Sequence, residues 1–274
     1  SLENLLAAWK EFTRGKRSRK DVQEFERNLM ANIILLHSEF VNFRYRHGYY
    51  QAFNISDPKP RNIHKASVRD RLLHNAIYRK LYPFFDRIFI ADSFSCRFDK
   101  GTLRAINRFR AFAYKNSKNN TRTTWVLKGD VKKFFASIDH AVLLEILNSY
   151  ILDKRIIWLI NQVVSSFSSI GPNTGLPLGN LTSQLLVNVY MNEFDQFVKH
   201  KLKIKYYIRY ADDFVIFSED KEQLSNLLTK IEEFLDTRLK LKLHPDKVFI
   251  KSLASGVDFL GWINFFNYRV LRTS

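Results

Sequence analysis

The sequence predicts an α+β fold in which helices back a small antiparallel sheet. Two apolar, β-prone runs flank Ala211-Asp-Asp213 between Tyr206 and Phe217, a pattern that is typical of a hairpin. Several longer segments instead place apolar residues at helical spacing. No internal repeat or low-complexity linker interrupts the chain. We therefore expect both kinds of element to pack together in one large domain or two closely associated subdomains.

The first part of the chain is expected to be helical. Apolar residues recur at helix spacing over residues 2–47. Five basic residues in seven, from Arg14 to Lys20, interrupt this pattern. They are either a solvated loop or a contact for a phosphate backbone. Asp21 is expected to cap a second helix that continues to Phe40.

A basic hairpin follows these helices. The pattern predicts a strand over 49–55, a turn at 57–60 and a return strand that begins over 61–64. Arginine forks match phosphate oxygens, so this hairpin is suited to gripping a triphosphate through Lys59 and Arg61. Ordinary surface charge is the alternative explanation of the same residues.

The rest of the chain alternates helices with loops and strands. In order, we expect a helix from 67, a loop over 93–102 that opens a helix at 103, a strand over 123–130, a turn and short helix over 131–140, one or two helices over 141–165, a loop over 171–179, a long helix from 180, the central hairpin, a helix over 221–239, and strands over 247–251 and 257–263.

The excess of basic residues is the feature of the composition that constrains function most. The 274 residues include 44 Lys and Arg against 27 Asp and Glu, a formal charge of +17. This indicates a polyanionic partner, either nucleic acid or an anionic membrane surface. No apolar run approaches the roughly 20 residues that span a bilayer, and no signal-peptide pattern is present. The lone Cys96 excludes an internal disulfide and fits a reducing cytoplasm, where we expect the protein to act without a membrane partner.

Three carboxylates form the candidate chemical site. Asp130 ends a predicted strand, and Asp212 and Asp213 lie at the tip of the central hairpin. If these elements pair in one sheet, the acids converge at its edge. Hard oxygen ligands of this kind bind Mg2+ and leave positions for water and phosphates. Together with the basic charge, the acids favour a polymerase or a nuclease over an ordinary turn. A nuclease is less favoured because no His or Glu accompanies them in the pattern.

Six motifs resemble those of reverse transcriptases, in the family's order, from Asp57 to Trp262. They are Lys59-Pro-Arg61 and Val68-Arg-Asp-Arg71, similar to finger motifs; Lys128-Gly-Asp130-Val-Lys-Lys-Phe-Phe135, similar to the first catalytic motif; Tyr210-Ala-Asp-Asp213, similar to the Tyr-X-Asp-Asp motif; His244-Pro-Asp-Lys247, similar to the motif whose lysine lies near pyrophosphate; and Asp258-Phe-Leu-Gly-Trp262, similar to the primer-grip hairpin. The resemblance implies an enzyme, an RNA-directed DNA polymerase with a right-hand fold of fingers and palm.

The resemblance also implies a domain layout. We expect a helical N-terminal extension of the fingers at 1–56, fingers at 57–105 and 141–172, and palm at 106–140 and 173–265. Only twelve residues follow Trp262. The thumb is therefore expected to be missing or vestigial, with residues 266–274 as its truncated start.

One loop resembles a particular subgroup of reverse transcriptases. Leu178-Gly-Asn-Leu-Thr-Ser-Gln184 stands where intron-type enzymes usually carry Gln-Gly, and it is similar to the reverse transcriptases of diversity-generating retroelements. Ser93-Phe-Ser-Cys-Arg97 and Lys100-Gly-Thr102 are similar to the same group. Those enzymes copy a template-repeat RNA with frequent errors at adenine and work with a small basic accessory protein. Alternatives are a group II intron, retron, CRISPR-linked or phage-defence enzyme, and a catalytically inactive RNA-binding protein.

The resemblance assigns metal roles residue by residue. Asp130 and Asp212 would ligate two Mg2+ ions, with Mn2+ as an alternative metal. Asp213 would support the same metal site, and the Val131 backbone would add a ligand. Lys247 would protonate pyrophosphate.

The resemblance assigns substrate roles as well, for an RNA template, a DNA or RNA primer and dNTPs. Lys59 and Arg61 would hold the triphosphate, and Tyr210 would lie close to the primer end. Phe135 would stack under the sugar and exclude a 2′-hydroxyl, unless it is only a buried core residue. Leu178, with Gly179 and Gln184 in the same stretch, would contact the incoming nucleotide. An apolar Leu178 in place of a polar contact would weaken base discrimination several-fold.

Overall fold

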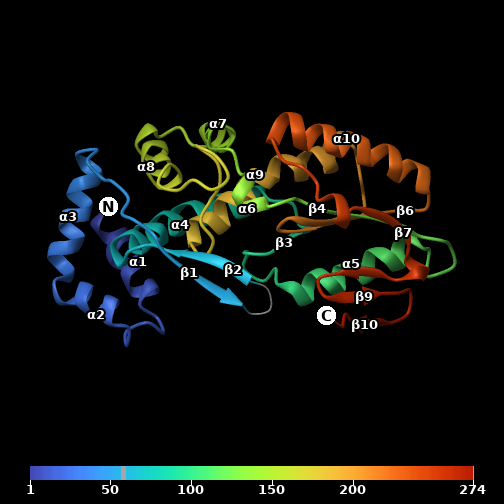
Figure 1. Ribbon diagram of the computed structural model, residues 1–274, viewed down its shortest axis with the longest axis horizontal. Coiled ribbons are helices and arrows are strands. Elements are labelled where there is room, and N and C mark those ends of the chain that lie inside the picture. Colours follow the sequence, from blue (N-terminus) through green and yellow to red (C-terminus); the bar gives the residue numbers. More distant parts are fainter. Residues whose placement is uncertain (57–59, 274) are drawn as a thin grey trace. The chain divides into compact units, whose positions relative to one another are not determined.

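The computed structural model describes residues 1–56 and 60–273 (Figure 1). The chain divides into two compact units: residues 1–88 with 135–189 form unit 1, and residues 89–134 with 190–274 form unit 2. The boundaries of these two units differ from those of the fingers and palm expected above, which remain a prediction. Lys59 lies outside the described residues.

Unit 1 begins with three helices, α1 (Leu2–Phe12), α2 (Lys20–Arg27) and α3 (Leu29–Val41). The single helix expected from Asp21 to Phe40 is therefore wrong, because the backbone breaks at Asn28. Asp21 is not a cap either. It lies in the first turn of α2, and its carboxylate accepts from Lys65 at 2.7 Å and Arg71 at 2.6 Å.

The core of unit 1 forms where these helices pack on α4 (Val68–Ile88). The apolar face of α1, spaced at three and four residues, is buried there, as expected for an amphipathic helix. The fully buried members of this core include Leu5, Trp9, Phe12, Ile33, Leu36 and Leu72. This packing fixes the N-terminal end of α4.

The basic hairpin of unit 1 is present as β1 (Gln51–Ser56) and β2 (Pro60–Lys65), paired antiparallel. The region expected to hold one or two helices holds α7 (His140–Tyr150) and α8 (Lys154–Val164). Asp139 and Asp153 cap them with side-chain hydrogen bonds. The short helix α6 (Phe134–Ser137) precedes α7.

Unit 2 is built on a five-stranded sheet in the order β3-β5-β6-β4-β7. These strands are β3 (Ser93–Phe94), β5 (Tyr207–Tyr210), β6 (Asp213–Ser218), β4 (Trp125–Asp130) and β7 (Phe249–Ser252). All neighbours pair antiparallel except β3 and β5. Strand β3 was expected as part of a loop. It is only two residues long, too short for a periodic pattern to reveal.

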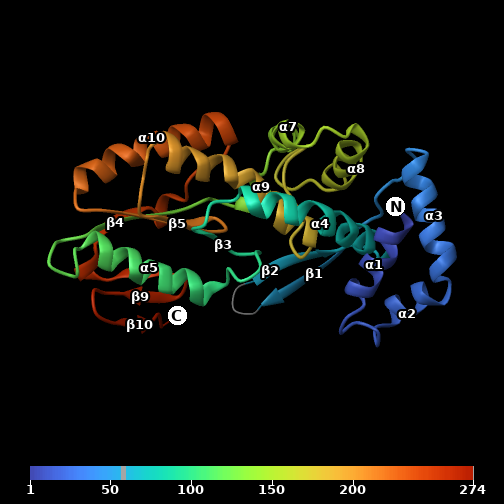
Figure 2. The same ribbon diagram turned by 180° about the vertical axis from the view of Figure 1, so that it is seen from behind.

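Helices cover both faces of this sheet. Helix α10 (Lys221–Leu239) and the end of α9 (Leu181–Gln196) lie on one face, and α5 (Thr102–Asn116) lies on the other (Figures 1 and 2). Alternate residues of each strand therefore meet different helices. The side facing α5 forms one core, which includes Phe109, Phe112, Val126, Ile208, Val215 and Phe217.

A second sheet of unit 2 consists of β8 (Val257–Phe259), β9 (Trp262–Asn264) and β10 (Arg269–Leu271), all antiparallel. The single strand that the apolar pattern predicted over 257–263 is wrong, whereas the hairpin that the resemblance implied at 258–262 is present. The chain reverses there because Leu260 and Gly261 both have positive φ, 53° and 83°.

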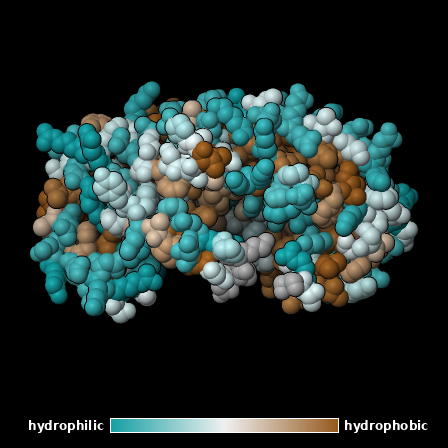
Figure 3. All heavy atoms as spheres, in the orientation of Figure 1, coloured by the Kyte–Doolittle hydropathy of each residue, from teal (hydrophilic) through white to brown (hydrophobic). Residues whose placement is uncertain are grey.

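Hydrophilic residues cover much of the face of the molecule shown in Figure 3. Among the residues that the structure describes, no helix combines the length and the apolar character needed to cross a membrane.

Candidate active site

The central hairpin places two carboxylates at one edge of the unit 2 sheet, the edge where the inner strands β5, β6 and β4 begin or end. Strands β5 and β6 are joined by Ala211 and Asp212, and Tyr210 pairs with Asp213 in the register. Ala211 has φ 53°, a left-handed conformation that costs an alanine about 1 kcal/mol. Two hydrogen bonds hold it there: Arg209 Nη1 donates to the Ala211 carbonyl at 3.0 Å, and the Ala211 amide donates to the Phe94 carbonyl at 3.4 Å.

Strand β4 brings Asp130 beside this hairpin. Asp130 is the register partner of Asp213, and the Val131 amide donates to the Asp212 carbonyl at 3.3 Å. The close fit depends on Gly129, because a Cβ there would lie 2.3 Å from the Phe214 ring. The structure therefore brings Asp130, Asp212 and Asp213 to one edge of one sheet.

Two lysines lie among these acids. Nζ of Lys247 is 3.0 Å from Oδ1 of Asp130, and its side chain is 46% exposed. Nζ of Lys128 is 3.5 Å from Oδ1 of Asp213, and its side chain is only 9% exposed. Lys128 was not singled out from the sequence. Its position two residues before Asp130 on one strand, hence on the same face, was the available signal.

Burial, followed by repulsion between the carboxylates, sets the electrostatics of the site. Burial raises the pKa of Asp212 to about 6, and the charges of Asp213 and Asp130 add to the effect. Burial also raises the pKa of Asp213, although the neighbouring Lys128 opposes the rise. The acids therefore carry more negative charge than the two lysines balance, and a further cation would be stabilised beside them.

The three carboxylates suit a metal ion by their chemical type, although they are not already arranged around a metal position. Among residues 1–56 and 60–273, no group of three or more His, Cys, Asp and Glu side chains is arranged to hold a metal ion. Oδ1 of Asp213 is nevertheless buried, and its nearest cation is the Lys128 ammonium group at 3.5 Å, beyond the distance of a good hydrogen bond. Three carboxylates whose charge the two lysines leave uncompensated are a donor set that suits a hard divalent cation such as Mg2+.

A buried charge cluster supports the hairpin turn. Nε and Nη2 of Arg209 donate to the two carboxylate oxygens of Asp195 at 2.8 and 2.6 Å, and the Tyr207 hydroxyl donates to the same carboxylate at 2.7 Å. All three residues are fully buried. An arginine within an otherwise apolar strand was a signal in the sequence, but nothing in the pattern identified its partner on α9.

Tyr210 is half-buried beside this turn. Its hydroxyl lies 3.0 Å from Oγ1 of Thr102, the first residue of α5. Tyr210, the residue expected near the primer end, therefore contacts the first turn of α5.

The remaining predicted site residues belong to unit 1. Arg61 is exposed on β2. The loop with Leu178 and Gly179 lies against the same strand: the His64 amide donates to the Leu178 carbonyl at 3.1 Å, and a Cβ on Gly179, whose φ is 97°, would lie 2.8 Å from Ile63.

Phe135 and Gln184 complete the set in unit 1. Phe135 is half-buried, so it is not a fully buried core residue, and its carbonyl accepts from the Leu176 amide at 2.8 Å. Gln184 is half-buried in the second turn of α9, and its carbonyl accepts from the Asn188 side chain at 3.3 Å.

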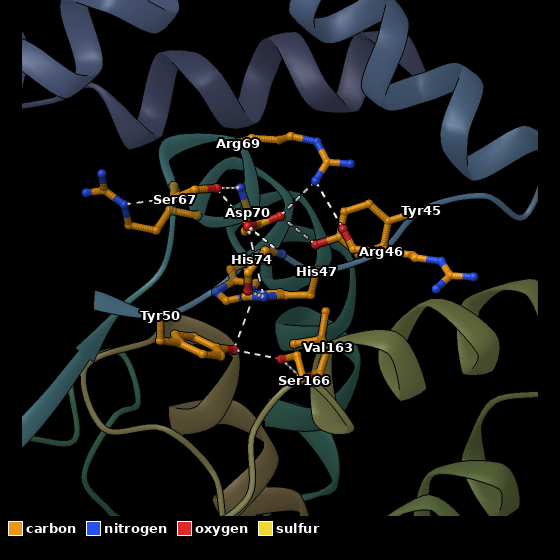
Figure 4. Close-up of polar contacts among 12 residues, drawn as sticks. Tyr45, Arg46, His47, Tyr50, Ser67, Arg69, Asp70, His74, Val163 and Ser166 are labelled. Atoms are coloured by element: carbon orange, nitrogen blue, oxygen red, sulfur yellow. Dashed lines mark hydrogen bonds and ion pairs between the residues drawn. The ribbon is translucent and has the colours of Figure 1, made fainter. Parts of the chain in front are cut away.

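The finger-like motif at 68–71 has a structural role within unit 1 (Figure 4). The buried Asp70 carboxylate accepts from the Tyr45 hydroxyl at 2.8 Å, the Ser67 hydroxyl at 2.7 Å and the Gly48 amide at 3.1 Å. His47 and His74 stack beside it, with their Nε2 atoms 3.1 Å apart. These bonds fix residues 45–50 on α4.

The arginines of that motif form ion pairs inside unit 1. Arg69 pairs with Glu39 and Arg71 with Asp21. In this structure their guanidinium groups therefore hold α3 and α2 against α4.

Comparison with known proteins identifies the family. The profile described as "Reverse transcriptase (RNA-dependent DNA polymerase)" matches residues 56–264. Protein YkfC of Escherichia coli (strain K12) is 26% identical over 243 residues, which cover 75% of this chain and 63% of that protein. Group II intron-encoded protein LtrA of Lactococcus lactis subsp. cremoris is 24% identical over 209 residues, which cover 50% of this chain and 34% of that protein. The chain thus spans less than two thirds of these relatives.

Solved structures share the fold. The apo telomerase of Candida tropicalis, truncated from its C-terminal domain, matches with a TM-score of 0.59 at 13% identity, covering 82% of this chain and 55% of that one. The telomerase of Candida albicans in complex with a fragment of telomeric RNA matches with a TM-score of 0.61 at 12% identity, covering 84% of this chain and 46% of that one. The matched profile spans most of the chain, including all three acids, so this chain belongs to the reverse transcriptase (RNA-dependent DNA polymerase) family.

Proposed function

We propose that the chain adds dNTPs to a DNA or RNA primer on an RNA template, as an RNA-directed DNA polymerase. The single observation that carries this proposal is the convergence of Asp130, Asp212 and Asp213 at one sheet edge, with Lys247 beside them. Family membership and the charge of +17 support the same substrates.

Each residue at the edge has a distinct task in this proposal. Asp130 and Asp212 hold two Mg2+ ions, or Mn2+, with Asp213 and the Val131 carbonyl as further ligands. When bound, such ions activate the attacking hydroxyl and stabilise the leaving oxygen. Lys247, whose ammonium group lies next to Asp130 and is half-exposed, donates a proton to the departing pyrophosphate.

The other roles rest on the resemblance. Lys59 and Arg61 hold the triphosphate. Phe135 selects against a 2′-hydroxyl. Tyr210 contacts the primer end.

Base discrimination is assigned to the loop at the start of α9. Leu178, Gly179 and Gln184 contact the incoming nucleotide in this proposal. The backbone bond from His64 to Leu178 supports it, because it holds the loop on the strand that carries Arg61. In this proposal the fingers are at 57–105 and 141–172, and the palm is at 106–140 and 173–265.

The biological system has two candidates. The stretch from Leu178 to Gln184 supports a diversity-generating retroelement, with error-prone cDNA synthesis and a small basic accessory protein. The curated relatives include a group II intron-encoded protein, which supports service to such an intron as the second candidate. Fidelity at template adenines separates the two.

Primer extension with Mg2+ on an RNA template tests the activity. The wild-type chain should incorporate dNTPs, whereas Asp130→Asn and Asp212→Asn should lose activity and keep RNA binding. A wild-type chain that binds RNA normally but incorporates nothing would show an RNA-binding protein instead. Product sequencing then tests fidelity: Leu178→Gln should lower misincorporation at template adenines several-fold, and an unchanged error rate would reject the role of Leu178.

A further inference from the structure

A groove runs along the exposed side of α5 in unit 2. A cavity of about 450 Å3 lies between this helix and the segment that leads into it, residues 91–100. A second cavity of about 550 Å3 lies between the helix, Asn120 and residues 266–267. The two cavities share Asn107 and Ala111 as lining residues, so they form one continuous surface, here called the α5 groove.

Helical spacing explains why this surface exists. One face of α5 is buried against the sheet through residues such as Ala105, Phe109 and Phe112. The α5 residues that line the groove recur mostly at intervals of three and four away from that face, and they are Arg104, Asn107, Arg108, Arg110, Ala111 and Tyr114. The small Ala111 lines both cavities.

The α5 groove is strongly basic. Its lining contains four cationic side chains, Lys100, Arg104, Arg108 and Arg110, and one carboxylate, Asp92. Asp92 is mostly buried and is already paired with Nε of Arg108 at 2.6 Å. The groove is therefore complementary to an anionic ligand.

Arg104 is the cation most available to such a ligand. Its side chain is 64% exposed, and the nearest carboxylate, Asp99, lies 3.7 Å away and is itself 83% exposed. An ion pair so open to water contributes little. A phosphate could therefore displace it at small cost.

Aromatic and amide groups lie at the other end of the α5 groove. Tyr114 is 49% exposed, and Phe266 is half-buried. Three amide side chains accompany them, those of Asn107, Asn120 and Asn267. Flat rings stack on unpaired bases, and amides can bond to base edges. A duplex has no free base faces and would leave these rings unused.

We propose that the α5 groove binds a single strand of nucleic acid, with phosphates at Arg104 and Arg108 and bases against Tyr114. None of the acids of the carboxylate edge lines this groove. The site is thus additional to the proposed polymerase site, and it is argued from the charge and shape of unit 2 rather than from catalysis.

Site-directed crosslinking tests the placement. The full chain is irradiated with an unstructured 12-nucleotide RNA that carries 4-thiouridine, and the crosslinked peptide is identified by mass spectrometry. We expect the crosslink in the peptide containing Tyr114, and its loss in Tyr114→Ala. A DNA strand of the same sequence distinguishes RNA from single strands in general. Crosslinks only elsewhere would overturn the proposal.

Fluorescence anisotropy with matched charge variants tests the energetics. Arg104→Glu should weaken binding of the 12-nucleotide strand about tenfold and lower the slope of log affinity against log salt by about 0.7 for each phosphate that the variant no longer neutralises. Lys230→Glu, the same charge change at an exposed position of α10, should change affinity less than about twofold. Equal effects of the two variants would show that affinity depends only on the net charge of the protein, and would reject the site.

Two further readouts keep this proposal separate from the polymerase proposal. Primer extension on a short hairpin substrate should be unchanged in Arg104→Glu and Tyr114→Ala, because neither residue lies at the carboxylate edge. A duplex that competes with the labelled strand as well as an unlabelled single strand does would refute binding through bases. A chain that crosslinks at Tyr114 yet extends no primer would reject the polymerase proposal alone.

Discussion

Asp195 and Arg209 form a fully buried, bidentate ion pair next to the turn that carries Asp212. Removing one partner would leave an uncompensated charge in the interior of unit 2. Asp195→Ala should therefore lower the free energy of unfolding by about 3–5 kcal/mol. Urea denaturation followed by fluorescence measures this. A loss below about 1 kcal/mol would mean that water reaches Arg209 in the variant.

Arg209 also positions the active-site turn, which gives a second prediction. Its guanidinium serves both Asp195 oxygens and the Ala211 carbonyl at once, and a lysine ammonium cannot reproduce that fork. Arg209→Lys should keep the charge and lower kcat in primer extension at least about tenfold, with a smaller change in the KM for dNTP. A wild-type kcat in a folded Arg209→Lys protein would show that the turn needs no such support.

Gly129 gives a prediction about packing at the same edge. A Cβ at this position would lie 2.3 Å from the Phe214 ring, so the ring or the strand must shift. Gly129→Ala should lower the free energy of unfolding by about 1–3 kcal/mol and disturb Asp130 next to it. Gly101→Ala is the matched control, because an added Cβ there meets nothing within 4 Å. Similar losses in both variants would point to backbone effects instead of the Phe214 contact.

Most elements of the fold could be predicted because their residues repeat at a clear period. Helix α10 begins at Lys221 and ends at Leu239, as the apolar spacing indicated, and the hairpin around Asp212 and Asp213 is present. The predictions were wrong where a local change of backbone conformation interrupts the apolar spacing. The break at Asn28 and the reversal at Leu260 depend on single backbone conformations that apolar spacing does not encode.

The acids of the site were predictable, but their neighbours were not. Asp130 and the hairpin acids stand out because charged residues end apolar runs. Lys128 meets Asp213 only through strand register, and Arg209 meets Asp195 only because α9 packs against the sheet. Such pairings depend on tertiary structure, which a single sequence does not reveal.

Lys128 provides a prediction about metal affinity. Burial raises the pKa of Asp213, and the Lys128 ammonium group, 3.5 Å away, opposes that rise, so it favours the ionised form that binds a cation. Lys128→Met should raise the pKa of Asp213 and shift the pH at which primer extension reaches half its maximum upward. Lys251→Met, an exposed position on the neighbouring strand β7, is the control. An unchanged pH profile in Lys128→Met would remove Lys128 from the site.

The pH dependence of the metal-free protein follows from Asp212. Its pKa in the folded protein is about 6, against 3.8 for the ordinary carboxyl, because of burial and the neighbouring carboxylates. Between these values the native state holds more protons than the unfolded state, so the free energy of unfolding falls as pH rises from about 4 to 6 and levels off above that. For a half-buried group the loss is on the order of 2 kcal/mol.

Urea titrations with chelator present, from pH 4 to pH 8, measure this loss. Asp212→Asn carries no charge at any pH, so its advantage over the wild type should be near zero at pH 4 and reach its full size above pH 6. Added Mg2+ should stabilise the wild type more at pH 8 than at pH 5, because protons compete with the ion for the carboxylates. A difference between variant and wild type that stays constant across the range would show that Asp212 titrates normally, and the repulsion among the three acids would then be too weak to draw in a metal ion.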